Sequence, residues 1–177
     1  MNGKTEANAL QVIVRLARED DLPRLNAIYN WAVENTAATF DLERRGPKQA
    51  LDWFASHQDE FYPLFVLAAG SDIAGWGSLS PFHTRPAYRL SGEFSLYLAP
   101  EFQGRGLGHV LLCHLCDEAG RLGYHTLLGL ISGSNTASLA LAGKHGFREV
   151  GRYSEVGWKF GCWQDVVVVQ RLWASAK

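Results

Sequence analysis

Gln103-Gly104-Arg105-Gly106-Leu107-Gly108 lies between a strand-like run at 93–98 and a segment at 107–122 whose apolar residues have helical spacing. Unsatisfied backbone amides and the positive end of the helix dipole meet at a helix N-terminus, so this order of elements predicts an anion site. The three glycines allow the backbone to approach a phosphate closely. A tight turn would also explain a few glycines before a helix, so the surrounding sequence has to decide.

Two common nucleotide-binding folds are excluded by the residues around this glycine stretch. No Gly-Lys-Ser/Thr closes it as in a P-loop, and the chain lacks the opening β-α-β unit with an acidic ribose ligand that dinucleotide-binding folds use. The chain has 177 residues, of which 47% are hydrophobic and 20% charged, which is typical of a folded globular protein. Its 17 basic and 18 acidic residues provide no global field to attract nucleic acid or an anionic membrane, so an anion site must be local.

Three further features of the sequence predict a cytoplasmic protein. Apolar runs such as 166–169 are far shorter than the roughly 18 residues of a membrane span. Residues 1–10 lack the basic region and apolar core of a signal peptide, so we expect a flexible polar tail there. The three cysteines are an odd and sparse set, which predicts reduced thiols; they are Cys113, Cys116 and Cys162.

The pattern on both sides of the glycine stretch predicts one mixed α/β domain over residues 11–177. On the N-terminal side we expect a strand, two helices, a hairpin and a further strand, at 12–16, 22–35, from 47, 64–69 with 73–79, and 93–98. On the C-terminal side we expect a helix, a strand, a second helix and two last strands, at 107–122, 126–131, 135–144, 147–156 and 165–172. The apolar stripe of the first of these helices is predicted to hold Leu107, Val110, Leu111, Leu115 and Leu122.

The glycine stretch matches the pattern Gln/Arg-x-x-Gly-x-Gly/Ala, and in this the sequence resembles the GNAT superfamily of acyl-CoA-dependent N-acyltransferases. Four further segments are similar to its phosphinothricin acetyltransferase-like branch, which acts on amino acids and methionine sulfone or sulfoximine: 80–82, 85–89, 93–98 and 156–166. The resemblance implies a central twisted, mostly antiparallel sheet that is flanked by helices and splayed between its fourth and fifth strands. It also implies acetyl-CoA as the cofactor and a homodimer.

The same resemblance implies where acetyl-CoA binds. Pantetheine would lie in the splay of the sheet against Leu96, Tyr97 and Leu98. The pyrophosphate would be held by the glycine stretch and the residue after it, which are Gln103, Gly104, Arg105, Gly106, Leu107, Gly108 and His109. Asn135 and Lys144 would add contacts from the next helix. Asn135 also suits the N-cap of that helix, and the two roles are compatible.

Acyl transfer to an amine needs a base, because an ammonium ion has no lone pair with which to attack. Glu93, at the start of the strand expected to carry the acyl group, matches the family's general base; the alternative is a solvated glutamate at a strand end. A backbone amide near Leu98 would stabilise the oxyanion. The acid that protonates the leaving thiolate in relatives is missing here, because its position is Ala142. His145 lies one turn later, where packing is the expected role.

Arg85 suggests the acceptor, because a guanidinium can hold a carboxylate or phosphinate with two hydrogen bonds. Phe40 and Tyr88 are candidates for an aromatic wall, with general packing as the alternative. His83 stands where relatives often carry a further arginine, which would weaken an anion clamp at neutral pH. These four residues form the predicted substrate site for a small amino acid-like amine.

No metal site is expected. Cys113 and Cys116 have Cys-x-x-Cys spacing with histidines nearby, but they lie in a predicted helix, lack a second pair and fall away from the apolar stripe. The sequence therefore predicts an N-acetyltransferase that transfers the acetyl group of acetyl-CoA directly to a primary amine. Two alternatives stay open: an acetyltransferase for a protein N-terminus or another amine, and a CoA-binding regulatory module without catalysis.

Overall fold

The computed structural model describes residues 11–173, so the predicted tail at 1–10 lies outside the described residues. The first half holds β1 (Val12–Leu16), α1 (Leu22–Asn35), α2 (Pro47–Ala55), β2 (Leu64–Ala69), β3 (Asp72–Pro81) and β4 (Ser91–Leu98). The second half holds α3 (Leu107–Arg121), β5 (Thr126–Ser132), α4 (Thr136–Lys144), β6 (Arg148–Lys159) and β7 (Cys162–Leu172). Short 3-10 turns lie at Glu19–Asp21, Pro86–Tyr88 and Pro100–Phe102.

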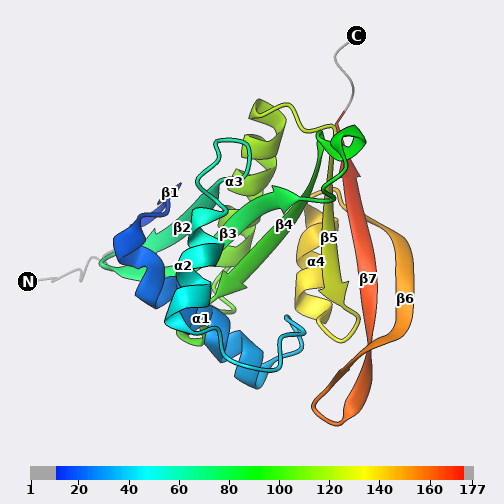
Figure 1. Cartoon of the computed structure of the whole chain (residues 1–177), viewed down its shortest axis with the longest axis horizontal. Helices are drawn as coiled ribbons and strands as arrows, with labels where there is room; N and C mark the ends of the chain where they lie inside the picture. Colours follow the sequence, from blue (N-terminus) through cyan, green and yellow to red (C-terminus); the bar gives the residue numbers. More distant parts are fainter. Residues whose placement is uncertain (1–10, 174–177) are drawn as a thin grey trace, which may run out of the picture.

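The strands form one mixed sheet in the order β1-β2-β3-β4-β5-β7-β6, in which only β4 and β5 are parallel neighbours (Figure 1). Alternating residues of β3 show how the helices cover it. Trp76 points to the α1 and α2 face, where its indole donates to the Leu25 carbonyl at 3.1 Å and its ring lies 4.9 Å from that of Trp53. Gly77 faces α3, whose Leu111 and Leu115 leave no space for a side chain there.

The expected splay of the sheet is present between β4 and β5. The two strands pair only from Ser91 with Thr126 to Glu93 with Leu128. Beyond Glu93 they separate, while β4 stays paired with β3 as far as Leu98. This part of the sheet therefore leaves one side of β4 unpaired, and Figure 1 shows α4 alongside the gap.

The helix periodicities explain most of the core. The predicted apolar residues of α1 are all buried: Leu22, Leu25, Ile28, Tyr29 and Ala32. The stripe predicted for α3 is partly wrong, because Val110 is 39% exposed and Cys116 is buried at 2% exposure. At about 100° per residue, the buried positions of α3 cover nearly half of its circumference, centred near Leu115, and the predicted stripe followed one border of that face.

The last hairpin is longer than predicted. β6 continues to Lys159 and β7 begins at Cys162, around a two-residue turn in which Phe160 and Gly161 have φ of 53° and 75°. The rings of Trp158 and Trp163 meet across the strands with centroids 5.2 Å apart. Cross-strand packing of aromatic residues therefore extends the ladder beyond its predicted ends.

Among residues 11–173, no helix has both the length and the apolar character that crossing a membrane requires.

Candidate active site

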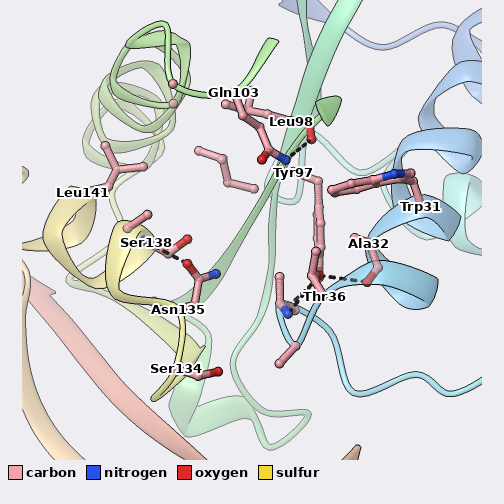
Figure 2. Close-up of a pocket in the computed structure, with 16 residues that line it drawn as sticks. Trp31, Ala32, Thr36, Tyr97, Leu98, Gln103, Ser134, Asn135, Ser138 and Leu141 are labelled. Carbon is pink, nitrogen blue, oxygen red and sulfur yellow. Dashed lines mark hydrogen bonds between the residues drawn. The ribbon is translucent and has the colours of Figure 1, made fainter. Parts of the chain in front are cut away.

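Two adjoining cavities lie where β4 separates from β5. The larger has a volume of about 450 Å³ and is bounded by the end of α1, β4, the glycine stretch and the start of α4 (Figure 2). The smaller, of about 130 Å³, lies between β4 and β5. Six residues line both cavities, so that the two form one continuous cleft: Ala38, Leu96, Tyr97, Asn135, Ser138 and Leu141.

The glycine stretch turns into α3 at one end of this cleft. Gly104 and Gly106 have φ of 72° and 78°, a region that residues with a side chain rarely adopt, and Gly106 is the N-cap residue of α3. Gly108 lies close to Leu98 and Leu141, with 3.1 Å between an added Cβ and the Leu141 side chain. A side chain at position 108 would therefore narrow the cleft at the helix N-terminus.

The predicted pyrophosphate residues divide into two groups. Gln103, Gly104 and Gly108 line the larger cavity, and Gln103 Nε2 donates to the Leu98 carbonyl at 3.1 Å. The others line neither cavity. The guanidinium of Arg105 lies 5.5 Å from the Phe102 ring centre, Leu107 is buried in the core, Gly106 is at the helix cap, and His109 is exposed.

Asn135 caps α4 and lines the cleft at once. Its side-chain oxygen accepts from the backbone N–H of Ser138 at 3.1 Å, so the predicted capping role is confirmed. The remaining amide nitrogen of Asn135 points toward the cavity in Figure 2. Lys144, at the other end of α4, is exposed and lines neither cavity.

The predicted pantetheine residues form the β4 wall of the cleft. Leu96, Tyr97 and Leu98 all line the larger cavity, and the Tyr97 ring packs 4.7 Å from that of Trp76. The Tyr97 hydroxyl donates to the Ala38 carbonyl at 3.3 Å, and burial raises the pKa of this phenol. The Tyr97 side chain therefore forms a fixed and uncharged part of the cleft wall.

Glu93 lies at the point where β4 leaves β5. It is the last residue of β4 that pairs with β5, it lines the smaller cavity, and it is half-buried. Burial raises the pKa of the Glu93 carboxyl above its ordinary value. The solvated strand-end alternative does not fit this environment, whereas a raised pKa brings a carboxylate closer to that of an effective base.

None of the four predicted acceptor residues lines either cavity. Phe40 packs against Gly157 of β6. The loop between β3 and β4 holds the other three, all exposed, where the Arg85 backbone N–H donates to His83 Nδ1 at 3.2 Å and the rings of His83 and Tyr88 are 5.0 Å apart. The structure thus brings His83 and Tyr88 together, while Phe40 packs against the hairpin of β6 and β7.

Neither the position of the missing acid nor His145 reaches the cleft. Ala142 is buried in the core at 1% exposure. His145 is buried at the C-cap of α4, with its ring 4.6 Å from that of His109. Burial and the neighbouring His109 lower the pKa of His145. A packing role fits this position.

Sequence reasoning missed the α1 side of the cleft. Five residues at the end of α1 and in the segment after it line the larger cavity: Trp31, Ala32, Thr36, Ala37 and Ala38. The Thr36 hydroxyl donates to the Ala32 carbonyl at 2.8 Å and accepts from the Ala38 backbone N–H at 3.1 Å. A threonine at this position is a sequence signal for the end of the helix. It does not indicate that the segment after the helix faces β4.

The cleft runs from a glycine-lined helix N-terminus to a half-buried glutamate, along an unpaired strand edge, and it brings together some of the predicted cofactor residues with Glu93. The model of the acetyltransferase (GNAT) family matches residues 25–147. The chain belongs to the GNAT family of acetyltransferases. A phosphinothricin N-acetyltransferase of Streptomyces coelicolor is 39% identical to this acetyltransferase over 164 residues, which cover 91% of this chain and 96% of that one.

Two solved acetyltransferase structures are also similar to this chain. The GNAT phosphinothricin acetyltransferase of Sinorhizobium meliloti, in complex with acetyl-CoA, is 31% identical with a TM-score of 0.88, and the match covers 91% of this chain and 88% of that one. A ribosomal-protein-alanine N-acetyltransferase of Brucella melitensis is 36% identical with a TM-score of 0.88, over 91% of this chain and 99% of the other. The acetyltransferase described here is acetyl-CoA dependent, and its cleft has the donors that a phosphate and a pantetheine arm require: helix-terminal amides, an open strand edge and a side-chain-free position 108.

Proposed function

We propose that this acetyltransferase transfers the acetyl group of acetyl-CoA to the primary amine of a small amino acid-like acceptor of the phosphinothricin or methionine sulfoximine kind. The observation that carries the proposal is Glu93, half-buried and with a raised pKa, in the cavity between β4 and β5. The curated relative and the Sinorhizobium structure support the acceptor class, because both are named for phosphinothricin.

In this proposal each part of the cleft has one task. Bound acetyl-CoA supplies the activated acyl group. The backbone at Gln103–Gly108 and the amide of Asn135 bind and orient the cofactor, and β4 from Leu96 to Leu98 provides the edge along which pantetheine lies. Glu93 accepts the proton from the acceptor's ammonium group at its carboxylate, directly or through water, so that the amine has a lone pair. A backbone amide near Leu98 stabilises the oxyanion.

A thiol-release assay with acetyl-CoA tests the function. Phosphinothricin, methionine sulfone, methionine sulfoximine, common amino acids, polyamines and peptides with a free N-terminus are compared at equal concentration. We expect the highest kcat/KM with the compounds that carry both an α-amine and an anionic or sulfoximine group. Equal or higher kcat/KM with polyamines would contradict the acceptor class.

A protein N-terminus is the second candidate acceptor, and the Brucella structure favours it, since that protein is named a ribosomal-protein-alanine N-acetyltransferase. Peptides that begin with alanine belong in the same assay for this reason. A non-catalytic CoA-binding module is the alternative of another class. It would bind acetyl-CoA in calorimetry and release no thiol with any acceptor.

We also propose that the acetyltransferase is a cytoplasmic homodimer. The three cysteines are free, which suits a reducing compartment. The hairpin of β6 and β7 carries six large apolar side chains that are each more than half exposed: Val150, Tyr153, Val156, Trp158, Phe160 and Trp163. A patch of this kind is typical of a protein interface. Trp163→Glu should shift the molecular mass in light scattering from dimer to monomer, and a monomeric wild type would contradict the dimer.

A further inference from the structure

Acyl transfer leaves a thiolate that must be stabilised, and neither Ala142 nor His145 lines the cleft. The side of α4 that does line it has another group to offer. Asn135, Ser138 and Leu141 line both cavities, and Ser138 shares the smaller cavity with Glu93. Ala142 lies one turn farther along the helix, in the core, so the cleft-facing hydroxyl of α4 belongs to Ser138.

The Ser138 side chain has no competing partner. Its backbone N–H donates to Asn135, but its hydroxyl makes no hydrogen bond with any residue in the range 11–173. Figure 2 shows this hydroxyl pointing toward the cavity. Ser138 is the third residue of a nine-residue helix, where the helix dipole favours a negative charge. Both the hydroxyl and the helix end would therefore stabilise an anion beside them.

The other titratable groups of the cleft do not provide a proton there. Glu93 and Tyr97 are the titratable side chains among the residues that line the two cavities. Glu93 is on the β4 side and is needed as the base, while the Tyr97 hydroxyl is occupied by the Ala38 carbonyl. From β5 and the start of α4, the lining residues are uncharged.

We propose that the Ser138 hydroxyl is the hydrogen-bond donor to the departing sulfur, in place of the acid that is absent at Ala142. The inference rests on the proposed function. The Ser138 hydroxyl donates a hydrogen bond to the sulfur as the C–S bond breaks, so that the sulfur leaves as a stabilised thiolate. This thiolate then forms its S–H bond with the proton that the newly acylated nitrogen loses. The serine is unchanged at the end, and the first proton of the ammonium group leaves through Glu93.

The test titrates the thiol of CoA bound to the intact enzyme, by the ultraviolet absorbance of its thiolate against the enzyme with desulfo-CoA. Donation by Ser138 stabilises the thiolate, so Ser138→Ala should raise the pKa of the bound thiol by about one to two pKa units, which is the value of a charge-assisted hydrogen bond. The kcat of Ser138→Ala should fall about 10-fold or more with the KM for acetyl-CoA nearly unchanged. Ser138→Thr, which keeps the hydroxyl, should restore both values.

Thr136→Ala is the matched control, because it removes an exposed hydroxyl from the same turn of α4 that does not line the cleft. It should leave the thiol pKa as in wild type. Glu93→Gln removes the carboxylate charge, which could itself change the pKa of the bound thiol. The rise in thiol pKa caused by Ser138→Ala should persist in the Glu93→Gln background. CoA binding with an unchanged thiol pKa in Ser138→Ala would overturn the inference alone, whereas no CoA binding by the wild type would overturn the proposed function.

Discussion

The cofactor end and the predicted acceptor end of the active-site region differ in the groups that form them. At the cofactor end, Gln103, Gly104, Gly108 and Asn135 converge on one cleft. At the predicted acceptor end, the loop with Arg85 is exposed and lines neither cavity. A site that consists of backbone amides at a helix N-terminus is complete once its local turn and helix form. A site that consists of side chains on separate loops depends on where those loops pack.

The largest expected effect lies at the border between the two ends. Glu93→Gln should lower kcat by about 100- to 10,000-fold while acetyl-CoA affinity stays the same, since a positioned base contributes about that much. Because burial raises the pKa of Glu93, the wild-type rate should begin to fall at a higher pH than for an ordinary carboxyl as the solution is acidified, and the variant should lack this limb. A pH profile of kcat measures both. A wild-type profile in Glu93→Gln would require another base.

The cofactor end is tested by filling position 108. Gly108→Val places two methyl groups between Leu98 and Leu141, and acetyl-CoA affinity in calorimetry should fall about 100-fold, corresponding to about 3 kcal/mol of overpacking. Gly143→Val is the control, because an added Cβ there meets no atom within 4 Å. Unchanged affinity in a folded Gly108→Val protein would remove the glycine stretch from the site.

The acceptor end is tested by Arg85→Ala with two acceptors, one that bears a carboxylate and its uncharged amide. If Arg85 holds the anion, the KM for the carboxylate should rise about 10-fold, the lower range for a charge-assisted contact at an exposed position, and the KM for the amide should not. Arg89→Ala, an exposed arginine of the same loop, is the matched control. An equal loss with both acceptors would mean that Arg85 does not bind the anion.

The smallest effect concerns stability. The folded state raises the pKa of Glu93, so between its unfolded and folded pKa values the folded state binds more protons, and stability falls as the pH rises through that window. Glu93→Gln should therefore have a higher Tm than wild type at neutral pH and the same Tm at a pH where Glu93 is protonated. Thermal unfolding at both pH values measures this. A lower Tm of the variant at neutral pH would contradict the burial cost.

The sequence was sufficient for the order of the elements, for the buried side of α1 and for the glycine turn into α3. It was insufficient where a residue's surroundings come from distant segments. Cys116 was expected away from the core because periodicity shows the direction of a stripe but not how many neighbours cover the helix. The length of the β6–β7 hairpin depends on Trp158 and Trp163 meeting across the strands, which spacing does not reveal.

By itself, the sequence determined what depends on near neighbours: the amides at the start of α3, the Asn135 cap of α4 and the presence of a glutamate on β4. Tertiary structure alone decided that β4 and β5 separate just after Glu93, that residues 36–38 close the cleft, and that Ser138 faces it. The physical reason is the separation in sequence between the residues that interact. Helix dipoles, caps and left-handed turns are fixed by a few consecutive residues, whereas the burial of Glu93 and the opening of the cleft result from the packing of segments far apart in the chain.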